Sequence, residues 1–162
     1  MTRSVRVVVS GSDRAWRAAI ARPTALARRA ARAALKIRPG AVPPGASEIG
    51  IVLSDDAAVR SLNKTHRGQD HPTNVLSFPV EADGGPQGLR LLGDVVLARE
   101  TLINEAGLAG KPIENHFSHL VVHGILHLLG FDHETERDAE LMEAAEKAAL
   151  AHLGMPDPYG TP

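Results

Sequence analysis

One stretch near the C-terminal end, HGILHLLGFDH (residues 123–133), carries three histidines at spacings of four and six, with a glycine before the last of them. In a helix, residues four apart lie about 40° and ~6 Å from each other, so His123 and His127 share a face. Gly130 favours the end of that helix, because glycine adopts a left-handed turn at little cost. The chain can then turn back and offer His133. We therefore expect a helix and a following turn that bring three imidazoles together.

Three converging imidazoles are typical of a metal site. Three protein ligands with a fourth position open are the pattern of catalytic zinc, which lowers the pKa of a water ligand towards ~7. We predict one zinc ion per chain, held by His123, His127 and His133. His119 lies two helical turns from His127, too far to share its metal, so we expect His119 and His116 in the pocket wall or behind the ligands. Unliganded histidines, or a metal that only stabilises the fold, are the alternatives.

The residue after the first histidine argues against one kind of chemistry. The histidine spacing coincides with that of metzincin proteases, H-E-x-x-H-x-x-G-x-x-H, whose glutamate is the general base. Gly124 stands in that place here. Glycine inside a helix costs about 1 kcal/mol relative to alanine, so we expect that it leaves room beside the metal. The missing carboxylate disfavours peptide hydrolysis by that mechanism and suits an extended anionic substrate.

Elsewhere the hydrophobic pattern predicts alternating strands and helices. β-branched and apolar runs indicate strands at 5–9, 48–53, 75–80 and 91–98, with the third and fourth forming a hairpin around the flexible loop 81–88. Capping residues, prolines and glycines indicate helices at 24–37, 54–64, 99–107, 112–129 and 135–152. We predict an α+β fold: one mixed four-stranded sheet covered by about five helices, in a single domain over residues 1–162.

Composition and charge limit the class of protein further. The chain has no cysteine, which fits a reducing compartment, and no apolar run approaches the ~18 residues that a membrane span needs. The N-terminal apolar run is too short for a signal peptide, so we expect a cytoplasmic protein without a membrane partner. Residues 1–38 hold ten Arg or Lys against Asp13, whereas residues 134–162 hold seven acids against Arg137 and Lys147. This asymmetry indicates either a surface for nucleic acid or a solvated helix face.

Several segments together resemble one family. HGILHLLGFDH resembles the signature H-G-x-L-H-L-x-G-(Y/F)-D-H of the YbeY-type endoribonucleases, which are bacterial rRNA maturation factors. LNKTHRGQDHPTNVLSFPVE (62–81) resembles the family segment N-x-x-(Y/W/H)-R-x-x-D-x-P-T-(D/N)-V-L-S-F-P. LLGDVVLA, GKPIENHFSHLVVHG and GMPDPYG also resemble family segments. The resemblance covers about residues 47–160, and His66 stands where an aromatic residue is more usual.

The resemblance implies a zinc-dependent, single-strand-specific endoribonuclease that acts in 16S rRNA 3′-end maturation and small-subunit quality control. Its partners would be single-stranded RNA, the rRNA precursor, the small ribosomal subunit, and a ribosomal protein or GTPase. The implied metal ligands are His123, His127 and His133, and the implied catalytic residues are His123 and Arg67. The alternatives are a non-catalytic RNA-binding assembly factor with a structural metal, and a zincin-like metallopeptidase.

Residue chemistry gives the remaining candidates. We expect Arg67 in a polar loop, where its guanidinium could pair with phosphate, or alternatively with Asp70. Asp94 stands in an apolar strand, so we predict that it orients a ligand histidine or Arg67. Asp132 either orients His133 or caps a turn. The general base stays unassigned, since the nucleophile could be water or the 2′-hydroxyl of the RNA.

Overall fold

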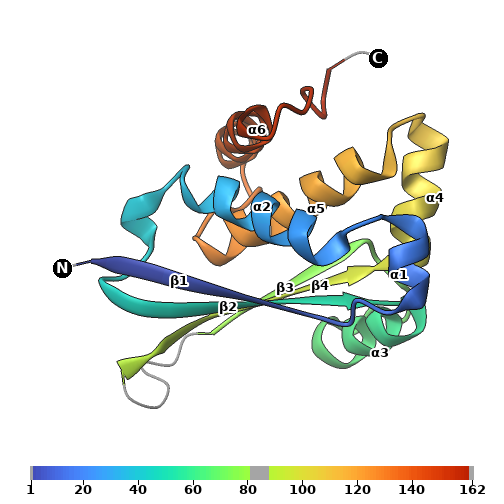
Figure 1. The fold of residues 1–162 in the computed structure, drawn as a ribbon, viewed down its shortest axis with the longest axis horizontal. Helices are drawn as coiled ribbons and strands as arrows, with labels where there is room; N and C mark the ends of the chain where they lie inside the picture. The colour runs from blue at the N-terminus through green and yellow to red at the C-terminus, as the bar shows by residue number, and fades with distance from the viewer. Residues whose placement is uncertain (1, 81–87, 161–162) are drawn as a thin grey trace.

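The computed structural model describes residues 2–80 and 88–160 and has an α+β fold (Figure 1). Its elements in chain order are β1 (Arg3–Ser10), α1 (Arg14–Ala19), α2 (Pro23–Leu35), the 3-10 turn η1 (Pro39–Ala41), β2 (Gly45–Ser54), α3 (Asp56–Arg67), β3 (Val75–Pro79), β4 (Arg90–Ala98), α4 (Arg99–Ala109), α5 (Ile113–Leu128) and α6 (Glu136–His152). The predicted four strands and five helices are therefore present. The helix α1 was not predicted.

The four strands form one mixed sheet in the order β1-β2-β4-β3. β1, β2 and β4 run parallel, and β3 pairs antiparallel with β4, with Phe78 opposite Asp94. This pairing confirms the predicted partnership of the third and fourth strands. The loop expected between them lies outside the described residues except for Gly88. β1 and β3 are the edges of the sheet.

Helices cover both faces of the sheet (Figure 1). Val95 and Leu97 of β4 belong to the larger core, which also contains buried residues of α2, α5 and α6. Val96 and Ala98 point the other way and pack with Val59 of α3. Because neighbouring residues of a strand face opposite sides, Asp94 lies on the α3 face.

Local sequence explains where several helices begin. The Asp55 side chain accepts a hydrogen bond from the Ala58 amide at 2.9 Å, and Thr135 accepts one from Asp138 at 3.1 Å. Both are N-caps, which satisfy amides that the first turn leaves unpaired. Asp13 caps α1 in the same way, and Trp16 of this short helix is fully buried against Phe117. A helix of six residues has too few turns to show a period, which is why the sequence pattern did not reveal it.

Among the described residues, the structure has no helix with the length and apolar character of a membrane span.

Candidate metal centre

The C-terminal end of α5 turns the chain back sharply. Gly130 has a φ of 97°, its amide donates to the His127 carbonyl at 3.1 Å, and the Phe131 amide donates to Leu126 at 3.0 Å. These two bonds form a Schellman motif, which requires the left-handed residue that glycine supplies. The Arg38 guanidinium lies 4.7 Å from the centre of the Phe131 ring and packs against the turn. The turn brings His133 beside the helix, as the sequence predicted.

The three histidines meet at this turn. One ring nitrogen from each of His123, His127 and His133 lies within 4.8 Å of the other two. The Nε2 atoms of His123 and His127 are 3.1 Å apart, so a proton or a cation must lie between their lone pairs. Burial and the neighbouring His123 and His133 lower the pKa of His127, which keeps its imidazole neutral and able to bind a metal. Three nitrogen donors without a fourth protein ligand in the described part of the chain fit a divalent ion with an open position.

A buried glutamate lies behind the ligands. Glu146 of α6 is 1% exposed, and its Oε2 lies 3.4 Å from Nδ1 of His123. The same oxygen bonds to Nε2 of His119, and the Tyr159 hydroxyl donates to Oε1 at 2.8 Å. Burial alone would raise the pKa of Glu146, but its hydrogen bonds with His119 and His123 lower it to about 2. This carboxylate therefore stays charged and directs Nε2 of His123 towards the other ligands.

Glu146 and Tyr159 are site residues that the sequence analysis missed, whereas His119 lies behind the ligands as expected. One signal was present for Glu146. It occupies the buried side of α6 together with Met142, Ala145 and Ala149, where an acid is costly unless it is paired.

The histidines open onto a cleft of about 620 Å³. Arg67 also lines it, as the last residue of α3 and not in a loop as predicted, because the helix continues to a left-handed Gly68 with a φ of 69°. The exposed Arg67 has no ion-pair partner among the described residues. Asp70 is instead bonded to Arg60 at 2.8 Å, so the alternative Arg67–Asp70 pair is wrong. The described residues that line the cleft include no acid. They are His66, Arg67, Thr73, Asn74, Val75, Leu76, Ser77, Phe78, Pro79, His123, His127 and His133.

The wall of the cleft is braced from α4 and α5. Glu105 accepts a hydrogen bond from the Asn74 side chain at 3.0 Å and lies 2.9 Å from Nε2 of His116. His116 thus supports the wall, as expected. The His66 ring packs edge-on against Phe78, with 5.1 Å between the ring centres, so the imidazole makes an aromatic contact at the rim of the cleft.

The two acidic candidates, Asp94 and Asp132, are not among the residues that line the cleft. Asp94 is exposed on the face of the sheet opposite α5, where its Oδ1 would be 2.1 Å from a Cβ placed on Gly50. The described structure shows no hydrogen bond between Asp94 and the histidines or Arg67, which contradicts the orienting role that we predicted. Asp132 is exposed and accepts a hydrogen bond from the Glu134 amide at 3.3 Å, so it caps the turn.

Gly124 has a different purpose from the one predicted. A Cβ at this position would lie 2.5 Å from Cγ1 of Val95 and 3.2 Å from Oγ of Ser77. The Ser77 hydroxyl also donates to the Gly124 carbonyl at 3.0 Å. The expectation of room beside the metal is therefore wrong, because the space next to Gly124 is filled by the sheet. The glycine lets α5 lie closely against β3 and β4.

Fold and site together define an α+β protein with three converging histidines, a possible metal site, beside a cleft that the described residues line without an acid. Comparison with known proteins narrows this class: the family model "Endoribonuclease YbeY" matches residues 14–154, and the chain belongs to this family. It is 48% identical over 164 residues to an "Endoribonuclease YbeY" of Paramagnetospirillum magneticum, and the match covers 99% of both chains.

Two other similar proteins support the assignment at different levels. An "Endoribonuclease YbeY" of Rhodopseudomonas palustris is 54% identical over 120 residues, which cover 71% of this chain and 62% of that protein, less than two thirds of its length. The solution structure of TM1509 from Thermotoga maritima has a TM-score of 0.57 and 21% identity, covering 98% of this chain and 100% of that one. This second similarity shows the fold alone.

Proposed function

We propose that residues 1–162 act as a single zinc-dependent domain that cleaves single-stranded RNA. The observation that carries the proposal is the cleft itself, in which a metal-binding triad and an unpaired arginine share a surface without an acidic side chain in the described chain. A polyanion suits such a surface, whereas a carboxylate would repel it. The endoribonuclease names of the relatives support the same activity.

The residues of the cleft have distinct tasks in this proposal. A zinc ion, when bound by His123, His127 and His133, would act as a Lewis acid towards a phosphodiester oxygen. Arg67 pairs with the phosphate and steadies its charge as the bond breaks. Glu146 holds the imidazole of His123 in one orientation and one tautomer. His66 and Phe78 offer rings against which a base can pack.

The biological substrate in this proposal is the 16S rRNA precursor, cleaved during 3′-end maturation and quality control of the small ribosomal subunit in the cytoplasm. A ribosomal protein or a GTPase would be a further partner. Support comes from the resemblance of residues 62–81 and 123–133 to the segments of the rRNA maturation factors.

Arg67→Ala tests the assignment of the cleft. Loss of one charge-stabilising donor commonly lowers kcat by about 10²–10³, and we expect a loss of that order with an unchanged metal content. The measurement is cleavage of a labelled single-stranded RNA by metal-loaded protein. Arg60→Gln is the matched control on the same helix, because Arg60 is bonded to Asp70 and does not line the cleft.

Two results would contradict the assignment. Full activity in Arg67→Ala would remove Arg67 from the chemistry. Wild-type protein that binds RNA and one metal ion yet leaves the RNA intact would favour a non-catalytic assembly factor. The ends of the products identify the nucleophile, since a 2′,3′-cyclic phosphate indicates attack by the ribose hydroxyl and not by water.

A further inference from the structure

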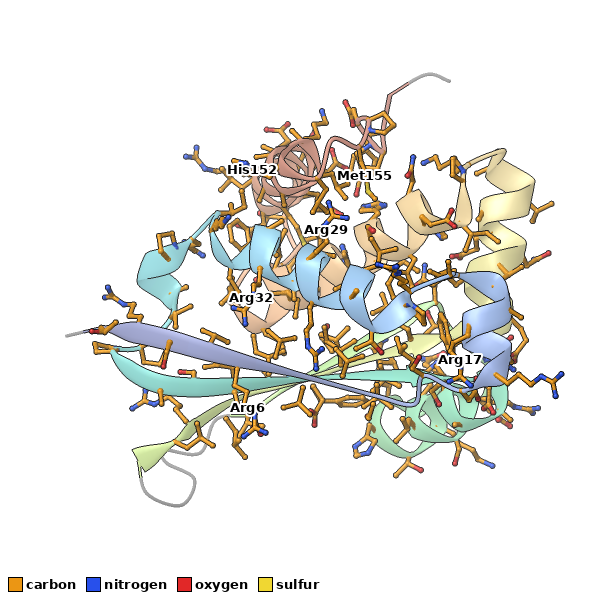
Figure 2. All side chains as sticks on the ribbon, in the orientation of Figure 1. Arg6, Arg17, Arg29, Arg32, His152 and Met155 are labelled. Carbon is orange, nitrogen blue, oxygen red and sulfur yellow. The ribbon has the colours of Figure 1, made fainter. Side chains whose placement is uncertain are left out.

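A stripe of cations runs along α2, away from the cleft. Arg28, Arg32 and Lys36 recur every four residues, so they share one face of the helix, and all three are exposed. Like charges at this spacing repel each other, and no acid of the described chain forms an ion pair with them. Figure 2 shows Arg32 where α2 passes over β1.

The arginines of the stripe are held in place by the neighbouring edge strand. Nε of Arg28 donates to the Val7 carbonyl at 3.3 Å, and a terminal nitrogen of Arg32 donates weakly to the Val5 carbonyl at 3.4 Å. Arg3 donates from Nε to the Val42 carbonyl at 2.8 Å. Each guanidinium donates one N–H to a backbone carbonyl, and its other N–H groups can donate to a ligand. Anchoring of this kind lowers the entropy that the side chains lose on binding.

A hollow of about 260 Å³ lies at the end of the stripe. Arg3, Arg32 and Lys36 provide its charge, and Val5, Leu35 and Val42 are among its apolar lining. The arginine and lysine side chains around the hollow can pair with a phosphate of an RNA backbone.

Arg38 connects this surface to the candidate metal centre. It follows Lys36 by two residues and packs its guanidinium on Phe131, which precedes His133 by two residues. Positive charge thus continues from the stripe towards the metal-binding turn.

We propose that Arg3, Arg28, Arg32 and Lys36 form a second contact surface for the RNA backbone, which holds a phosphate outside the cleavage cleft. This inference rests on the proposed function for the identity of the polyanion. The surface positions a long RNA and takes no part in bond cleavage. A short oligonucleotide that fills only the cleft does not reach it.

The test compares two triple variants with equal loss of charge. Arg28→Gln/Arg32→Gln/Lys36→Gln neutralises the stripe, while glutamine keeps an N–H donor at the first two positions. Arg14→Gln/Arg17→Gln/Arg22→Gln removes three cations of the same N-terminal region before α2 begins; at 1.5 Å per residue, Arg22 lies about 9 Å along the helix from Arg28 and about 20 Å from Lys36 at the hollow. The measurements are binding of a long single-stranded RNA at several salt concentrations, and cleavage of long and short RNA.

We expect the stripe variant to reduce the slope of log Kd against log salt by about 2, since each lost phosphate contact contributes about 0.7 for a single strand. Its KM for long RNA should rise about tenfold or more, with kcat and short-RNA cleavage unchanged, and the matched variant should stay near wild type. Equal effects of both variants, or no effect of either, would overturn the inference. So would binding to anionic lipid vesicles that depends on the stripe while RNA binding does not.

The result that would contradict the proposed function differs from the results that would contradict this inference. If metal-loaded wild type cleaves neither RNA but its RNA binding still depends on the stripe, the contact surface stands and the nuclease assignment falls.

Discussion

Glu146 is a carboxylate at a position where apolar residues pack. Two histidines and a tyrosine hydroxyl surround it, and this set of partners explains why it is tolerated and charged. Sequence spacing predicted that His123, His127 and His133 converge, because their geometry is local to one helix and one turn. The pattern of α6 could mark Glu146 as a buried acid, but it could not identify its partners, because the contact with His119 joins residues 27 apart through the packing of α5 and α6.

Glu146→Gln should weaken metal binding without removing a ligand. The neutral amide oxygen accepts hydrogen bonds more weakly than the charged carboxylate oxygen that now contacts both histidines, so the orientation of His123 is less restricted. Losses of this kind are about 10–100-fold in metal affinity. Competition with a chromogenic chelator measures the affinity, and circular dichroism checks the fold.

Tyr159→Phe is the graded comparison, because it removes one donor and leaves the carboxylate in contact with both histidines. Its affinity should fall less than that of Glu146→Gln. Wild-type affinity in Glu146→Gln would show that the carboxylate does not orient the ligand.

At the scale of elements, two glycines have different tasks, one inside α5 and one just after its end. Gly130 ends the helix, as its place after a periodic pattern predicted. Gly124 was predicted to leave room beside the metal, but in fact it leaves room for the side chains of Val95 and Ser77. A helix-capping glycine is recognisable from neighbouring residues, whereas a packing glycine depends on the strand that lies opposite, which the sequence alone does not identify.

Gly130→Ala should lower both stability and metal affinity. An L-residue in the left-handed region costs about 1–2 kcal/mol, and any shift of the turn displaces His133. Gly110→Ala is the matched control: it also has positive φ at a helix end, with open space around a Cβ. Both variants should lose similar unfolding free energy in urea, and only Gly130→Ala should bind metal less tightly. Equal metal affinities would show that the turn does not set the position of His133.

At the scale of the whole molecule, the class and the sheet were predictable because alternating apolar runs identify strands and helices without knowledge of their partners. The faces of the sheet were harder. Asp94 was expected to orient a ligand histidine or Arg67, but β4 turns it to the face of the sheet opposite the histidines, and it shows no hydrogen bond to Arg67 in the described structure; its register against β2 and β3 is a property of the assembled sheet.

The core also indicates what the metal contributes to stability. The larger core cluster unites the sheet with α2, α5 and α6 through buried apolar side chains. The protein should therefore stay folded without metal. Metal at a hundredfold excess over its Kd adds about 2.7 kcal/mol, which corresponds to a Tm change of roughly 5–11 °C for a chain of this size.

Calorimetry with and without a chelator tests this expectation, with His127→Ala as the variant that should not respond. Complete unfolding on chelation would instead identify the metal as a structural element.

The most direct test of a catalytic metal held by three histidines is a titration of metal-free protein with zinc, in which the cleavage rate of single-stranded RNA is measured at each metal content. We predict that the rate rises in proportion to bound metal and levels off at one ion per chain, and that His127→Ala prepared in parallel stays inactive. A metal-free protein that cleaves as fast as the loaded one, or a His127→Ala variant with the wild-type rate, would contradict the account.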